Sequence, residues 1–130
     1  MSPITVEWDD ADKRVLRYTY PEIWTWDDVF LIIEKGDALL DEVTSKVFII
    51  IDLSLSKTLP PNALPHGRNI LKRSHPNRGI YIVIGMNKFI QTMFETFMRL
   101  FGTLVSLPHT AQTLEEARAF VNKYHNLINA

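Results

Sequence analysis

The sequence predicts an α/β protein built on a mainly parallel five-stranded sheet. Two short apolar runs without alternation, residues 46–53 and 79–86, are typical of strands that are buried on both faces of a sheet. Amphipathic stretches with helical periodicity lie between the strand candidates. Strand and helix patterns follow one another in the order ββαβαβαβα, and such alternation is characteristic of parallel strands joined by right-handed crossovers.

The composition indicates a globular chain with one core. With 130 residues, 46% of them hydrophobic and 22% charged, residues 1–130 are expected to form a single domain rather than a disordered chain. The net charge of −1 provides no basic surplus, so we predict no nucleic-acid partner. The absence of Cys excludes disulfides and thiol chemistry. Neither a signal peptide nor an apolar run of about 18 residues is visible, so we expect a cytoplasmic protein without stable membrane insertion.

The first half of the chain predicts a hairpin, a helix and a buried strand. Residues 4–8 and 15–20 alternate loosely around a polar turn, which is typical of a β-hairpin. Thr25, followed three residues later by Asp28, resembles a capping box that would begin a helix over residues 26–43. The strand at 46–53 follows.

The second half repeats the alternation of helix and strand. Asn62 is expected to cap a second helix that reaches about residue 74, and Asn87 a third helix that ends at Gly102. Residues 103–107 predict a short fifth strand. Thr113, three residues before a Glu, then predicts the start of a last helix.

Candidate catalytic residues are few and isolated. Asp52 ends the central strand, where open α/β sheets place their ligands, but the other acids, hydroxyl and Lys of a phospho-accepting receiver domain are missing. We therefore interpret it as a structural carboxylate that accepts backbone N–H bonds from the next loop. His66 and His109 follow strands at one predicted sheet edge and could approach each other, but no His pair has metal-ligand spacing. No phosphate-binding loop, nucleophile elbow or dinucleotide pattern occurs, so we predict no metal and no cofactor.

Aromatic and Met side chains suggest where a ligand could bind. Trp24 and Trp26 flank the first helix and are expected to cover the core edge, with an exposed binding anchor as the alternative. The third helix is apolar over about half of its circumference, which is wider than a core-facing stripe requires. Either the core uses this whole face, or Phe94 and Met98 at its margin reach a partner or a lipid.

The hydrophobic strand that leads into Asp52-Leu53-Ser54, together with the preceding hairpin and helix, resembles the STAS family of anti-sigma-factor antagonists. The segments at 82–90 and 113–117 look like those of uncharacterised bacterial relatives. The resemblance implies a (βα) superhelix with sequential strands and helices largely on one side. It also implies binding of a protein partner such as an anti-sigma-factor-like kinase. The family's phosphorylated Asp-Ser pair would fall near Pro60 and Pro61, neither of which can accept phosphate.

These observations favour a non-catalytic regulatory protein-interaction module over an enzyme. Its contact surface is expected in the loop and helix after the central strand, at the following residues: Ser56, Thr58, Asn62, His66 and Arg68. A small-molecule or lipid-binding domain on a related fold is the alternative. An enzyme of unrecognised type would have to use Asp52, His66 or His109.

Self-association is also expected. Phe48 and Ile50 point to the sheet face opposite Val47, Ile49 and Ile51. If every helix lies on one side, one of these apolar sets needs another cover, which a symmetric homodimer could provide.

Overall fold

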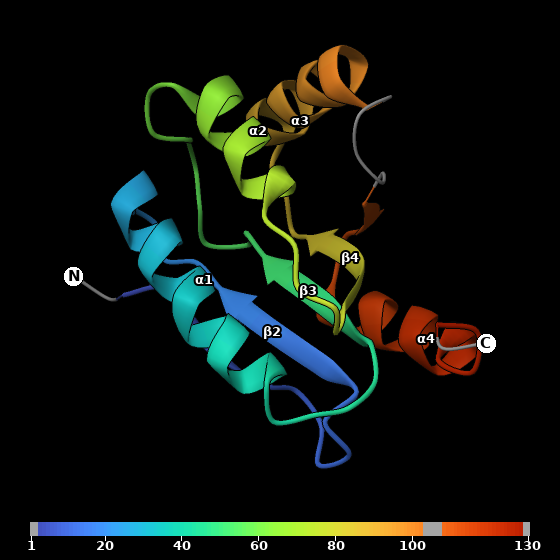
Figure 1. Ribbon diagram of the computed structural model, residues 1–130. Coiled ribbons are helices and arrows are strands. Elements are labelled where there is room, and N and C mark those ends of the chain that lie inside the picture. The colour runs from blue at the N-terminus through green and yellow to red at the C-terminus, as the bar shows by residue number, and fades with distance from the viewer. Residues whose placement is uncertain (1–2, 103–107, 129–130) are drawn as a thin grey trace.

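Five strands lie side by side in the order of the sequence, and four helices surround them (Figure 1). The computed structural model describes residues 3–102 and 108–128. The chain forms a small α/β domain with a mixed sheet. Its elements in order are β1 (Thr5–Trp8), β2 (Val15–Thr19), α1 (Trp26–Leu40), β3 (Val47–Asp52), α2 (Ala63–Lys72), β4 (Arg78–Ile84), α3 (Lys88–Phe101), β5 (His109–Ala111) and α4 (Leu114–Tyr124).

The pairing of the strands makes β3 the centre of the sheet. β1 and β2 are antiparallel, which confirms the predicted hairpin, whereas β2–β3, β3–β4 and β4–β5 pair in parallel. The sheet is therefore mixed rather than wholly parallel. The apolar run that the sequence singled out has a neighbour on both sides, so its backbone is hydrogen-bonded along both edges.

Three of the four predicted helix starts have the expected capping bonds. The side chains of Thr25, Asn87 and Thr113 each accept a backbone N–H from the first turn of their helix. The prediction for Asn62 was wrong. Its backbone is left-handed, with φ of 67°, and its side chain makes no capping bond. A cap requires extended backbone to aim the side-chain oxygen at the first turn, and the left-handed conformation aims it elsewhere.

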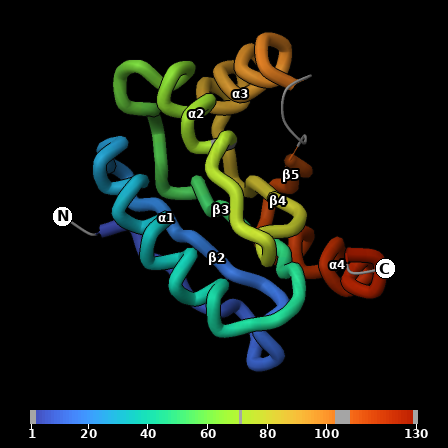
Figure 2. Tube along the Cα trace, in the orientation of Figure 1, coloured from blue at the N-terminus to red at the C-terminus, as the bar shows by residue number. Residues whose placement is uncertain are grey.

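The last strand lies later in the chain than expected. The predicted strand at 103–107 falls outside the described residues, and the described β5 begins at His109. α1 ends at Leu40 rather than at residue 43, because the backbone N–H groups of Glu42 and Val43 bond to carbonyls only three residues back and form a tight turn. Figure 2 shows β5 beside β4, at the margin of the sheet.

Each face of the sheet has its own helical cover. On β3, Val47 and Ile49 point into the core beneath α1, and Phe48 and Ile50 point into a second core beneath α4. The reason for expecting a dimer was wrong, because α4 covers the face that we left for a second copy (Figure 1). A homodimer stays a prediction, but it is not needed to cover an apolar face of the sheet.

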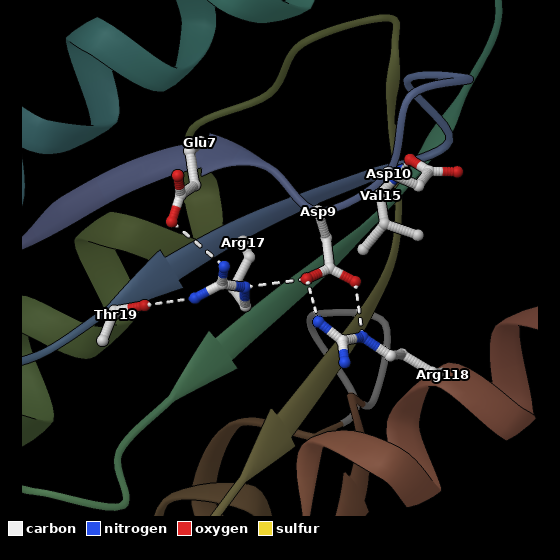
Figure 3. Close-up of polar contacts among 7 residues, drawn as sticks. All are labelled: Glu7, Asp9, Asp10, Val15, Arg17, Thr19 and Arg118. Carbon is white, nitrogen blue, oxygen red and sulfur yellow. Dashed lines mark hydrogen bonds and ion pairs between the residues drawn. The ribbon is translucent and has the colours of Figure 1, made fainter.

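An ion-pair cluster ties α4 to the hairpin loop (Figure 3). Arg118 donates two hydrogen bonds of 2.9 and 2.8 Å to the carboxylate of Asp9, and Arg17 donates a third of 2.9 Å. The Asp9 side chain is only 4% exposed. The hydrogen bonds from Arg118, together with those from Arg17, hold the pKa of Asp9 below its usual range even though burial opposes the shift. This cluster balances its own charges, and we interpret it as structural.

Candidate functional site

An apolar hollow lies between the helices α2 and α3 and the carboxyl halves of β3 and β4. Its volume is about 190 Å³. Figure 1 shows α2 and α3 side by side, standing away from the sheet. The residues that line the hollow are Tyr20, Trp24, Trp26, Ile51, Leu53, Leu59, Ala63, Leu64, Gly67, Ile70, Tyr81, Val83, Met86, Ile90, Met93, Phe94, Phe97, Met98 and Pro108.

The walls of this hollow offer carbon and sulfur atoms but no free indole N–H. The Trp24 nitrogen donates to the Ser56 hydroxyl at 3.0 Å, and the Trp26 nitrogen donates to the Pro61 carbonyl at 2.8 Å. Three of the four methionines in the sequence line the hollow. Thioether side chains are flexible and polarizable, so such walls can adapt to apolar ligands of different shapes.

A smaller chamber adjoins the hollow towards α1. Its volume is about 30 Å³, and it is lined by Tyr18, Tyr20, Ile33, Ile49, Ile51, Ile70, Arg78 and Tyr81. Burial raises the pKa of Tyr18, of Tyr20 and of Tyr81, and for Tyr81 the neighbouring Arg78 guanidinium opposes the rise. The three hydroxyls therefore stay protonated at neutral pH and can donate hydrogen bonds.

Contacts from α1 hold α2 over the hollow. The His66 ring stacks on Trp26 with ring centroids 5.3 Å apart and meets the edge of Phe30 at 5.9 Å. The buried Nδ1 of His66 has no hydrogen-bond partner among the described residues. On the other side of α2, Gly67 lies so close to Phe97 that an added Cβ would be 3.0 Å from the ring.

Of the five residues predicted to form a contact surface, four are at least partly exposed and Ser56 is buried. Ser56 is 2% exposed, and its hydroxyl donates to the Pro21 carbonyl at 2.9 Å while accepting from Trp24. It therefore supports the loop from within and cannot touch a partner in this structure. Thr58, Asn62 and Arg68 are exposed, and His66 is half-buried.

The candidate catalytic residues do not converge. His66 packs on α1, whereas His109 opens β5 and its ring lies 4.6 Å from that of Phe120 on α4, across the sheet. The sequence left open that these histidines could approach each other, and the structure places them on elements that pack against different helices, α1 and α4. Asp52 accepts hydrogen bonds from the backbone N–H and the hydroxyl of Ser54, as expected for a structural carboxylate.

The structure decides how the aromatic and Met side chains are used. Trp24 is only 6% exposed and belongs to the core, and Trp26 is half-buried against His66. Phe94 and Met98 are half-buried and line the hollow rather than the outer surface. The sequence analysis did not identify the hollow as such. The available signal was the combination of a Met-rich third helix with apolar residues spread too widely for one core face.

The comparisons with known proteins add no family to this description. No family model matches the sequence, and no curated protein is significantly similar to it. In the described part of the chain, no group of three or more metal-binding side chains is found, and none of the helices has the length and apolar character to cross a bilayer.

Proposed function

We propose that this protein is a non-catalytic binding domain for a small apolar ligand, which occupies the hollow beneath α2 and α3. The observation that carries the proposal is a hollow of about 190 Å³ whose Trp nitrogens are already bonded within the protein. A ligand there would contact carbon and sulfur almost everywhere. Such sites favour apolar ligands, because burial of apolar surface is the main free-energy gain.

The volume sets the size of the ligand. An engineered apolar cavity of about 150 Å³ binds benzene. The hollow is somewhat larger, so a single substituted ring or a short alkyl group fits without further opening. Longer chains would require α2 or α3 to move outward.

Ethylbenzene titrated into isotope-labelled protein tests the proposal. We expect saturable changes in the amide NMR signals of Ile90, Met93 and Phe97, which lie along the hollow. Met93→Trp should abolish the changes by filling the hollow. Leu127→Trp is the matched control, because Leu127 is 64% exposed and far from the lining residues in the sequence. Signals that do not saturate, or that respond equally in the Met93→Trp variant, would contradict the proposal.

A regulatory module of the STAS type is the second candidate function. It is supported by the sequential strand order, the N-terminal hairpin and the exposed loop after β3. In or near this loop, Ile23 and Leu55 are 63% and 61% exposed and flank a surface depression next to Lys57. Apolar side chains exposed beside polar ones are typical of protein contacts.

A photo-crosslinking experiment in cells tests this second function. A crosslinking residue would be placed at Thr58, Asn62 or Arg68, and at Lys123 on α4 as a control. One protein adduct formed from the first three positions but not from Lys123 would support a protein partner, such as an anti-sigma-factor-like kinase. Equal adducts at all four positions, or none, would contradict it.

A further inference from the structure

The apolar hollow and the small chamber share part of their walls. Tyr20, Ile51, Ile70 and Tyr81 line both spaces. A molecule in the hollow therefore has a neighbouring space of about 30 Å³ at one end. Such a space holds about one water-sized group. A ligand group that enters this space from the hollow has to pass between these four side chains.

Each polar side chain around the small chamber has at least one hydrogen to donate. The tyrosine hydroxyls can donate, and a guanidinium has donors but no acceptor. The Arg78 side chain is 8% exposed, and it donates to the Arg73 carbonyl at 2.9 Å. A ligand group that complements these donors is an acceptor oxygen.

The charge of the chamber is already balanced. Arg78 forms an ion pair with Asp37 of α1, whose side chain is 27% exposed. A ligand carboxylate in the chamber would therefore add an unpaired negative charge in a largely buried place. Burial of an unpaired charge is costly, whereas an uncharged carbonyl oxygen requires only a hydrogen bond.

We infer that the ligand carries a single uncharged acceptor oxygen, of the ketone, aldehyde or ester type, at one end of an otherwise apolar body of about one ring. The oxygen enters the small chamber and accepts a hydrogen bond from Tyr20 or Tyr81, while the ring lies in the hollow. This inference rests on the proposed function, since it specifies the chemistry of a ligand for the same site.

Three probes of similar size test the inference: acetophenone, ethylbenzene and benzoate. Their dissociation constants would be measured by NMR titration of the wild type, Tyr20→Phe, Tyr81→Phe and, as a control on the α4 side, Tyr124→Phe. We expect Tyr20→Phe or Tyr81→Phe to weaken acetophenone binding about three- to tenfold, the usual effect of one lost hydrogen bond. Ethylbenzene binding should change less than about twofold in every variant, and benzoate should bind more weakly than acetophenone.

The outcomes separate this inference from the proposed function. Saturable binding of ethylbenzene, with acetophenone unaffected by both tyrosine variants, would overturn the acceptor-oxygen inference and leave apolar binding intact. Benzoate binding as tightly as acetophenone would overturn the requirement for an uncharged ligand. If neither uncharged probe binds the wild type, the proposed function fails and this inference fails with it.

Discussion

The part of the sheet beneath α4 and the part beneath α2 and α3 are packed very differently. Beneath α4, the side chains of Phe48, Ile50, Ile82 and Ile84 are each at most 1% exposed. On the other side, none of the α2 side chains that the structure describes is fully buried. The comparison shows that one sheet can support closed cores beneath α1 and α4 and a ligand-sized hollow beneath α2 and α3.

The chemistry of the helices explains the difference. α4 places Ala117 and Val121 directly on the sheet, and the pair Arg118–Asp9 fastens it to the hairpin loop. α2 has Gly67 where it faces Phe97, so α2 and α3 pack on each other there. α3 leaves Phe89 and Leu100 more than half exposed. α2 and α3 therefore gain part of their stability from packing on each other. This packing leaves the space between them and the strands unfilled.

A pair of Phe truncations gives the largest expected contrast. Phe48→Ala should lower the free energy of unfolding by about 3–5 kcal/mol, because it opens a cavity in a closed core. Phe94→Ala, at the wall of the hollow, should cost less than about 1 kcal/mol, since this side chain is half-buried and already borders empty space. Urea unfolding measures both values. Equal losses would show that the core beneath α4 and the wall of the hollow are packed alike.

Two Gly→Ala substitutions should change the free energy of unfolding in different directions. A Cβ at Gly79 would lie 2.6 Å from the Val47 backbone oxygen, which cannot move, so Gly79→Ala should destabilise the fold by about 1–3 kcal/mol. At Gly67 the obstacle is the Phe97 ring beside the hollow, which can shift by tenths of an ångström. Gly67→Ala should therefore be neutral or stabilising by up to about 1 kcal/mol, because Ala favours the helix. Thermal unfolding of both variants measures the two changes in stability. A large loss of stability for Gly67→Ala would show that the Phe97 ring cannot shift.

The smallest expected effect concerns the ion pairs that fasten α4. Asp9→Asn should cost about 1–2 kcal/mol at pH 7, a value that allows for the 47% exposure of the Arg118 side chain. The pKa of Asp9 is lower in the folded state than in the unfolded chain, so its contribution is complete at neutral pH and is lost as the pH falls below about 4. Urea unfolding at several pH values checks this. The exposed Asp12→Asn in the same loop is the control, and a difference from wild type that persists at pH 2 would count against the ion-pair explanation.

Much of the fold could be predicted from local patterns. The apolar run at β3 indicated a strand buried on both faces, and Thr25, Asn87 and Thr113 marked helix starts that the structure confirms. These features depend on residues close in the sequence, so periodicity and capping chemistry are sufficient to find them. Ser56 shows the limit of such reasoning. It was expected on a contact surface because it lies in the loop after the central strand, but in the structure it is buried and bonded to Trp24, which lies 32 residues away.

The sequence alone determined the order of the elements along the chain. The strand order came from the structure, and with it the side of α1, α2 and α3, because right-handed crossovers between neighbouring parallel strands place helices on one face. The sequence did not determine the side of α4. That helix follows the last strand and crosses to no other, so only the tertiary packing on Phe48 and Ile50 places it on the opposite face. The hollow, likewise, arises from how far α2 and α3 stand from the sheet, which depends on contacts such as Trp26 with His66 between distant parts of the chain.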